Sequence, residues 1–158
     1  MRKKYLGFTL IELLIVIGII AFLASAIFIA IDPAQRFAAS RNARRWTDVS
    51  SILEGVLEYS VDREGALPPG IDDLPGTAQV LGVRGDAVCD VGCSTKTTAT
   101  ECLDLSGSLV SEYLSHIPYD PYTGSADFTD YYLNKTVKGR IEVGSCDPEL
   151  GATIYVSR

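Results

Sequence analysis

An apolar run of 24 residues near the N-terminus is the feature that most constrains this chain. It covers residues 8–31, and Glu12 is the one charged side chain within it. As an α-helix, such a run is about 36 Å long, enough to cross a hydrocarbon core of about 30 Å. A carboxylate in such a helix costs on the order of a few kcal/mol unless it is paired, although less near the helix end, where Glu12 lies. The run therefore predicts a membrane-spanning helix in which Glu12 needs a partner.

Two general explanations compete for this segment. A secretory signal peptide would begin with the basic residues 2–4 and be cut after the small residues 24–26. Against this, Glu12 falls inside the apolar part, and apolar residues continue past the supposed cleavage site. The other explanation is a plain membrane anchor, whose orientation follows the flanking basic residues. Charge counting leaves that orientation open, because basic residues flank both ends: Arg2, Lys3 and Lys4 on one side, and Arg36, Arg41, Arg44 and Arg45 on the other.

The same residues resemble the class III signal of bacterial type IV pilins and type II secretion pseudopilins. The resemblance rests on Lys3 and Lys4 followed by the sequence Gly7-Phe8-Thr9-Leu10-Ile11-Glu12. In that family a membrane peptidase removes a short basic leader that ends in Gly, and the new N-terminal residue, usually Phe, is N-methylated. The resemblance thus implies a leader of residues 1–7, cleavage between Gly7 and Phe8, and methylation of Phe8.

The resemblance also implies a partner for Glu12. The family carries a Glu at this position, which is thought to meet the N-terminal amine of a neighbouring subunit during assembly. A carboxylate and an ammonium group that are desolvated together attract each other strongly, whereas either one alone stays costly. We therefore expect Glu12 and the amine of Phe8 to be the assembly residues, which would set one axial register between subunits.

Beyond the membrane segment, the sequence predicts that the stem continues as an amphipathic helix over residues 32–64. Asp32-Pro33 should bend this helix or begin a new one. The helix is expected to end near Gly65, where turn residues follow. Its apolar face is marked by residues at spacings of three and four: Phe37, Trp46, Val49, Ile52, Leu53, Val56, Leu57 and Val61.

The remaining chain, residues 65–158, is expected to form one globular head together with residues 32–64. Residues 65–105 have the composition of ordered loops. The apolar spacing between Leu105 and Ile117 predicts a short helix that ends at Pro118. From Asp130 onward the pattern changes to that of strands, which we expect at residues 130–134, 140–143 and 153–157, with Lys138-Gly139 as a turn. The expected fold class is α+β: a small antiparallel sheet over the outer half of the long helix, burying the apolar face from Trp46 to Val61, as the resemblance also implies.

Four cysteines, Cys89, Cys93, Cys102 and Cys146, avoid the membrane segment and are even in number. This usage predicts an exported head with two disulfides. Of the three possible pairings, we favour one bridge within the middle loop and one that joins Cys146 to it. A zinc site is the less favoured alternative, because Cys89-x3-Cys93 is not a tight knuckle and His116 is the one histidine in the chain.

Residues 117–122, with Asp120 at their centre, precede Asp127 and Asp130. They resemble a segment of major pseudopilins in which a Pro-x-Asp-Pro-aromatic run precedes a calcium-binding loop. Oxygen atoms at such a turn bind calcium, but Asp-Pro and Thr-Gly are also ordinary turn residues, and the turn interpretation is favoured. Asn134-Lys135-Thr136 fits a glycosylation sequon, yet it lies beside a predicted strand. We expect no cofactor and name no metal ligand.

The net charge and the motifs of the chain argue against two classes of function, nucleic-acid binding and catalysis. The formal net charge is −6, and removal of three basic leader residues leaves 11 − 20 = −9. A broadly basic nucleic-acid surface is therefore not expected. The cluster of Arg36, Arg41, Arg44 and Arg45 is either a solvated or lipid-facing surface or a partner for acidic groups of adjacent subunits. There is one histidine, no Gly-x-Ser-x-Gly, no phosphate loop and no nucleophile with an obvious base, so we expect no enzyme.

The expected function is a structural subunit of a type IV pilus, for adhesion, motility or DNA uptake. The alternative is a pseudopilin of a type II secretion system, and a minor one is a membrane-anchored exported protein. The expected partners are other copies in a helical filament, the prepilin peptidase and N-methyltransferase, the inner-membrane assembly platform, and membrane lipid before assembly. The chain would lie in the cytoplasmic membrane with its head outside before assembly, and in an extracellular pilus afterwards.

Overall fold

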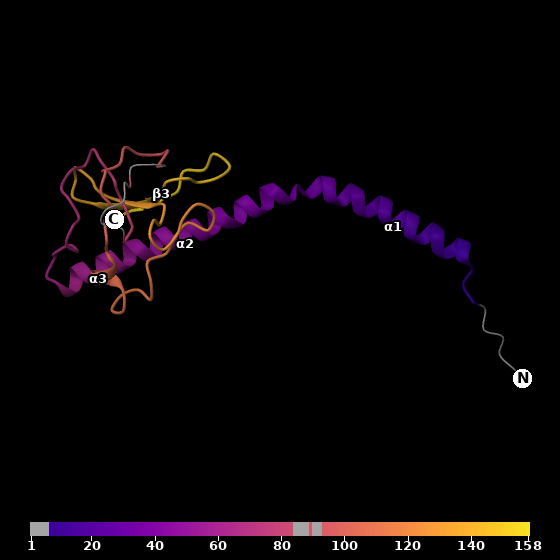
Figure 1. Ribbon diagram of the computed structural model, residues 1–158, viewed down its shortest axis with the longest axis horizontal. Helices are drawn as coiled ribbons and strands as arrows, with labels where there is room; N and C mark the ends of the chain where they lie inside the picture. The colour runs from indigo at the N-terminus through magenta and orange to yellow at the C-terminus, as the bar shows by residue number, and fades with distance from the viewer. Residues whose placement is uncertain (1–6, 84–88, 90–92) are drawn as a thin grey trace, which may run out of the picture. The chain divides into compact units, whose positions relative to one another are not determined.

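The structure is a computed structural model that describes residues 7–83, 89 and 93–158 (Figure 1). It divides into two compact units, Met1–Phe37 and Ala38–Arg158. Residues 1–6 of the predicted leader lie outside the described residues. The sheet, the disulfides and the apolar core all belong to the second unit.

The first unit is dominated by α1, Leu10–Ile31. Within it, Leu10–Phe28 has a mean hydropathy of 2.8, and among the described residues it is the one helix long and apolar enough to cross a membrane. Its large side chains are exposed throughout this stretch. By length and composition, α1 therefore suits the membrane segment that the sequence predicts.

The helix is interrupted at Asp32, as the sequence predicts. Asp32 adopts a left-handed backbone conformation with φ of 43° and ends α1. The next helix, α2, spans Pro33–Asp62. Its first residue is a proline, which suits this place because the first N–H of a helix has no partner within the helix. The Asp32 carboxylate accepts a hydrogen bond from Gln35 N at 3.3 Å. One residue thus ends the first helix and caps the second.

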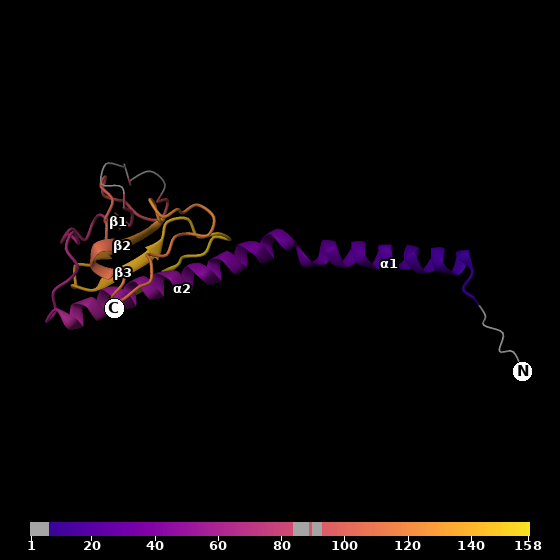
Figure 2. The same ribbon diagram turned by 60° about the horizontal axis from the view of Figure 1, so that its bottom comes forward.

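The second unit packs a four-stranded antiparallel sheet against α2 (Figure 2). The strand order is β1-β2-β3-β4. The strands are β1 Gln79–Val80, β2 Tyr131–Lys135, β3 Ile141–Ser145 and β4 Tyr155–Ser157. In the central pair, Leu133 lies opposite Val143. The α+β class and the three expected strands are confirmed, and β1, a strand of two residues, was not expected.

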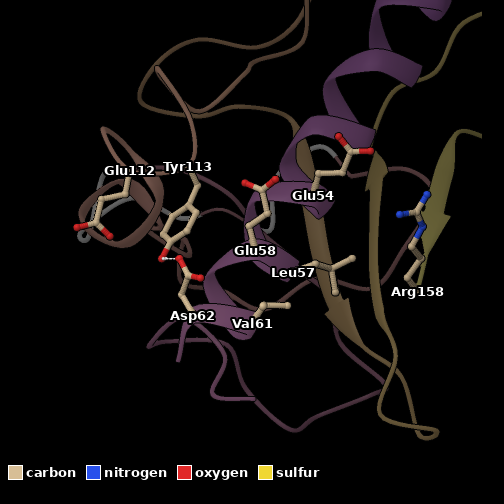
Figure 3. Close-up of a pocket in the computed structure, with 8 residues that line it drawn as sticks. All are labelled: Glu54, Leu57, Glu58, Val61, Asp62, Glu112, Tyr113 and Arg158. Atoms are coloured by element: carbon tan, nitrogen blue, oxygen red, sulfur yellow. Dashed lines mark hydrogen bonds between the residues drawn. The ribbon is translucent and has the colours of Figure 1, made fainter. Parts of the chain in front are cut away.

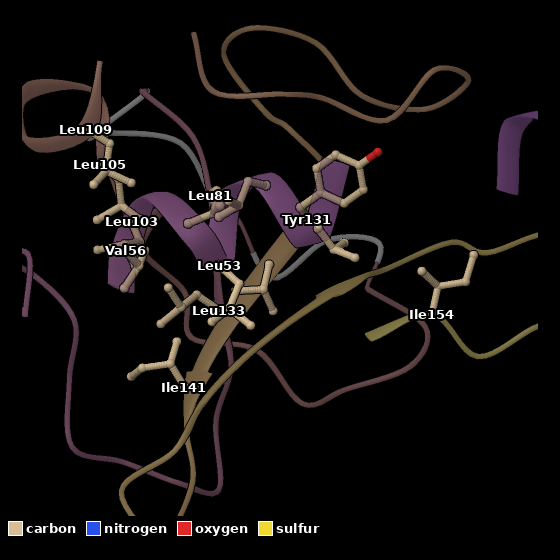
Figure 4. Packing of buried hydrophobic residues seen from close by; sticks show 13 residues of the cluster. Leu53, Val56, Leu81, Leu103, Leu105, Leu109, Tyr131, Leu133, Ile141 and Ile154 are labelled. Carbon is tan, nitrogen blue, oxygen red and sulfur yellow. The ribbon is translucent and has the colours of Figure 1, made fainter. Parts of the chain in front are cut away.

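The core lies between one face of α2 and one face of the sheet (Figure 4). The helix contributes Val49, Ile52, Leu53 and Val56, and β2 and β3 contribute Tyr131, Leu133, Ile141 and Val143. Burial of each such side chain stabilises the fold by about 1.5–3 kcal/mol. The expected apolar face was too wide, since Trp46 is 44% and Val61 79% exposed. Both lie off the buried face because successive helical residues turn by about 100°.

The predicted helix between Leu105 and Ile117 is wrong beyond its first turn. The observed helix, α3, is Ser106–Leu109. Ser111 has a left-handed backbone with φ of 81°, which a continuing helix does not permit. After this break, Leu114 packs on α2 at Gly55, where an added Cβ would lie 3.1 Å from Leu114 Cγ. Leu114, one of the apolar residues whose spacing suggested a helix, therefore packs on α2 from a non-helical segment.

Two disulfides close the middle of the head. Cys89 pairs with Cys102, and Cys93 pairs with Cys146, which follows β3 directly. The expectation of two disulfides is confirmed. Each of the three possible pairings would place one bridge inside the middle segment and one at Cys146, and the structure has Cys89 with Cys102 and Cys93 with Cys146. All four sulfur atoms are used in this way. The zinc alternative is therefore excluded for the structure described.

Candidate functional site

The candidate site for processing and assembly is the segment that precedes α1 and forms its first turn. Thr9 is the N-cap residue, and its hydroxyl accepts a hydrogen bond from Glu12 N at 3.3 Å. In return, the Glu12 carboxylate accepts hydrogen bonds from Thr9 N at 2.8 Å and from Thr9 Oγ1 at 2.7 Å. This is a capping box, which satisfies backbone donors at the start of the helix.

Sequence reasoning missed this capping box, although its signal was present. Thr9 followed by Glu12 three residues later, before an apolar run, is the sequence signature of such a cap. Glu12 therefore has a partner within its own chain. The expected pairing of Glu12 with the Phe8 amine is a contact between copies, and it stays a prediction.

The expected cleavage bond lies in an exposed stretch just before the helix. Gly7 is exposed, and a Cβ added to it would meet nothing within 4 Å. The Phe8 side chain is 84% exposed. A peptidase that approaches this bond would meet no obstacle from the described residues around it.

The predicted arginine cluster is divided by the fold, and Arg45 is not a surface residue at all. Its side chain is fully buried. Arg45 Nε lies 2.6 Å from Asp120 Oδ2, and Nη2 lies 2.9 Å from Oδ1. Nη1 donates to Glu149 Oε2 at 2.7 Å and to Asn42 Oδ1 at 2.8 Å. Both surface interpretations are therefore wrong for this residue. No local pattern marks Arg45 for burial, because its two acidic partners are distant in sequence.

Arg41 joins the same network from the surface side. Its Nε donates to Glu149 Oε2 at 2.7 Å. This hydrogen bond, with those from Arg45, lowers the pKa of the Glu149 carboxyl to about 2 against the opposing effect of burial. Glu149 O also accepts from Asn42 Nδ2 at 2.7 Å. These hydrogen bonds thus hold the segment before β4 against α2. Of the four arginines, Arg36 and Arg44 stay exposed.

The same network accounts for the role of Asp120, and it supports the interpretation of residues 117–122 as a turn rather than as part of a calcium site. Besides both bonds from Arg45, its Oδ1 accepts hydrogen bonds from Tyr122 N at 2.8 Å and Thr123 N at 3.1 Å. Burial acts to raise the pKa of Asp120, but these hydrogen bonds outweigh it, so the pKa lies below its ordinary value. Both oxygen atoms of the Asp120 carboxylate are thus bound by the guanidinium group of Arg45. The residues that the structure describes contain no group of three or more His, Cys, Asp or Glu side chains arranged to hold a metal.

Two other residues singled out in the sequence are buried. Asp130 has a left-handed backbone with φ of 62° and accepts a hydrogen bond from Thr123 Oγ1. Burial raises its pKa to about 6, with help from the negative charges of Asp147 and Asp120. Asn134 of the sequon is 8% exposed and donates to Pro75 O at 3.3 Å. The folded head therefore does not present Asn134 for glycosylation.

Comparison with known proteins supports the interpretation of the N-terminal segment. A family model described as the prokaryotic N-terminal methylation motif matches residues 2–28. No curated protein and no solved structure matches the chain. The matched residues include most of the leader, Gly7, Phe8 and Glu12. The chain thus carries the prokaryotic N-terminal methylation motif, the class III prepilin signal, at the start of an apolar helix.

Proposed function

We propose that this chain is a structural subunit of a type IV pilus filament. The observation that carries the proposal is the methylation motif at residues 2–28, which leads into an apolar helix long enough to span a membrane. A prepilin peptidase cuts after Gly7, and Phe8 is then N-methylated. The product is a building block for a filament, and it performs no reaction of its own.

The exposed apolar surface of α1 supplies the assembly interface. Large side chains such as Leu10, Phe22 and Phe28 are between 71% and 81% exposed. Before assembly this surface lies in lipid, because exposure of so many apolar groups to water is unfavourable. Lipid tails are as apolar as these side chains, so close packing between helices, rather than escape from water, favours the bundle of stems. An inner-membrane assembly platform transfers the subunit from lipid to the filament.

Cleavage gives Glu12 a second possible partner. In the chain alone, the carboxylate caps α1 through Thr9. In the filament, the new amine of Phe8 in a neighbouring copy competes for the same carboxylate. A charged pair in an apolar surrounding is favoured over either charge left alone. The exchange from capping to pairing therefore makes cleavage a condition for assembly.

The head has the properties of an exported module. Two disulfides fix its middle segment, and disulfides persist in oxidising compartments outside the cytoplasm. We propose that the chain spans the cytoplasmic membrane once with the head outside, and that the head is displayed on the pilus surface after assembly.

The alternative is a pseudopilin of a type II secretion system. The observation that favours it is the Pro-Tyr-Asp-Pro-Tyr run at residues 118–122, which resembles a segment of major pseudopilins. Electron microscopy of cells with and without the gene separates the two functions. Loss of long surface fibres supports the pilus, and loss of secretion with no change in surface fibres supports the pseudopilus.

Processing is tested directly by mass spectrometry of protein purified from its own cells. We expect an N-terminus at methylated Phe8. The control is Gly7→Val, whose branched side chain at the cleavage position should leave the leader attached. A wild-type protein that begins at Met1, or after Ala26, would contradict the proposal.

A further inference from the structure

The outer face of α2 in the second unit has an uneven distribution of charge. Arg44 lies near its start, and Glu54, Glu58 and Asp62 lie near its end. Residues three and four apart share one side of a helix, so this face runs through exposed Thr47 and half-buried Ser51 between the two ends. It is opposite the face that carries Val49 and Val56 into the core. The two ends of one helix face thus carry opposite charge.

The acidic end borders a groove of about 590 Å³ (Figure 3). Leu57 and Val61 of α2 form its apolar part, and Val61 is 79% exposed. The other lining residues are charged or aromatic: Glu54, Glu58, Asp62, Glu112, Tyr113 and Arg158. Figure 3 shows the α2 carboxylates around the two apolar side chains, with Glu112 and Tyr113 on one side and Arg158 on the other. Four carboxylates therefore share this groove with one guanidinium.

Among the described residues, no basic side chain forms an ion pair with these carboxylates, and Arg63 contacts Tyr113 of the same groove. Asp62 accepts a hydrogen bond from the Tyr113 hydroxyl at 3.1 Å. By contrast, the acidic groups that contact Arg45 are matched by guanidinium groups. The groove thus keeps an excess of negative charge beside exposed apolar surface.

Arg44 is the complementary group on the same face of α2. Its side chain is 57% exposed, and its Nε lies 3.7 Å from Asp48 Oδ2. That separation is long for an ion pair, and exposed pairs of this kind contribute little. Asp48 Oδ2 also accepts a hydrogen bond from Tyr131 Oη at 2.8 Å. Arg44 can therefore exchange this weak contact for a stronger acidic partner.

We propose that the groove receives Arg44 of a second copy of this chain. This inference rests on the proposed function, in which stems run parallel in one filament. Along a helix, Arg44 lies about 15 Å from Glu54 and about 21 Å from Glu58. A copy displaced along the stem by about that distance places its Arg44 beside the groove, where Val61 adds apolar contact. Such a head-to-tail contact joins two different surfaces, so it repeats without closing and extends a filament.

The contact would guide assembly as well as stabilise it. The apolar surface of α1 is attractive at many displacements, whereas opposite charges at a fixed spacing favour one displacement over others. Charges across an interface contribute mainly to register and partner choice. The excess negative charge of the groove also disfavours an anionic membrane surface as its occupant. A basic segment of another protein is the competing occupant.

The first test is charge reversal in cells, with filaments measured in the sheared surface fraction. We expect Arg44→Glu and the pair Glu54→Arg with Glu58→Arg each to lower filament protein by at least about fivefold, since like charges would face each other at every contact. Combining all three changes should restore filaments to within about twofold of the wild type, because opposite charges face each other again. All variants should still begin at methylated Phe8. Normal filaments from both reversed variants, or no recovery in the combined variant, would overturn the contact.

The second test is cross-linking between two tagged copies in assembled filaments. One copy carries Arg44→Cys and the other Glu58→Cys, and a short bis-maleimide should join them. The matched control replaces Glu58→Cys with Val137→Cys, since Val137 is 87% exposed and is not among the residues that line the groove. Filaments that form without a cross-linked product between positions 44 and 58 would overturn this inference alone. Capture of a different protein by the Glu58→Cys copy would do the same, and a wild type that forms no filament would overturn the proposed function too.

Discussion

Arg45 is a buried residue that joins three segments of the head. Its guanidinium is fully buried and joins α2 to Asp120 and Glu149, which lie in two separate segments. Loss of one partner from a buried pair leaves the other charge uncompensated, which typically costs about 3–5 kcal/mol. We expect Arg45→Ala to lower the free energy of unfolding by about that amount. Urea titration of the full chain in detergent, followed by Trp46 fluorescence, measures it.

Arg44 provides the matched control, because it is the preceding residue and is half exposed. Arg44→Ala should change the free energy of unfolding by less than about 1 kcal/mol. Equal effects of the two substitutions would show that burial of Arg45 does not matter for stability.

Asp130 is a residue whose charge opposes folding. Burial raises its pKa from 3.8 to about 6. A group whose pKa is higher in the folded state contributes stability that is complete below pH 3.8 and is lost as pH rises through about 6. Asp130→Asn removes this loss, and Asn tolerates the left-handed backbone at this position. We expect the variant to be more stable than the wild type at pH 7.5 by on the order of 2 kcal/mol.

The measurement is the urea midpoint between pH 3.5 and 8. The advantage of Asp130→Asn should shrink toward zero at the acid end, because the wild-type carboxyl is then protonated too. Asp127→Asn is the control, since Asp127 is exposed in the same loop. An advantage that stays constant with pH would refute the electrostatic explanation, because a lost charge must act through titration.

At the scale of elements, the two disulfides should stabilise the head unequally. Cys93–Cys146 spans 53 residues, and Cys89–Cys102 spans 13. If the bridges act by restricting the unfolded chain, their contributions are about 4 and 3 kcal/mol respectively. We expect Cys93→Ser with Cys146→Ser to be the more destabilising pair by urea titration. The reverse order would indicate that native packing, rather than chain entropy, decides their value.

The elements differ in how well the sequence predicts them, and the reason is the range of the interactions that fix them. Strand β3 alternates at Ile141, Glu142 and Val143, and β2 begins with two tyrosines, a residue type that favours strands, so local sequence is sufficient. Strand β1 has two residues and exists through pairing with β2, which no local pattern reveals. The helix expected before Pro118 fails because packing of Leu114 on Gly55 outweighs a weak local preference.

The candidate sites divide in the same way. The processing motif and the capping box are both contained in residues 7–12, so both can be recognised from the local sequence. The hydrogen-bond network around Arg45 cannot be predicted in this way, because Asp120 and Glu149 are 75 and 104 residues away in the sequence. In the sequence, Arg45 stands among other arginines and would be predicted to be exposed, because its acidic partners are known only from the structure. Ion pairs between residues far apart in the sequence are therefore the part of the site that the sequence does not predict.

At the scale of the whole molecule, the proposed function requires that one carboxylate serve two states of the chain. Glu12 caps α1 in the single subunit and pairs with a neighbour's amine in the filament. These roles respond differently to substitution. Gln keeps the capping hydrogen bonds but removes the charge, since Glu and Gln both serve at this position of a capping box. Thr9→Ala does the opposite, because it removes the capping hydroxyl and leaves the charge.

We therefore expect Glu12→Gln and Glu12→Ala to be cut after Gly7 and held in the membrane, yet to assemble filaments poorly. Thr9→Ala should assemble far better than either, since loss of a cap costs only about 1 kcal/mol and leaves the intermolecular pair available. Mass spectrometry of the N-terminus and the amount of sheared filament measure the two steps separately. If Glu12→Gln assembled like the wild type while Thr9→Ala failed, the role of Glu12 would be to start the helix. The register between subunits would then have to come from packing of α1 and from contacts made by the head.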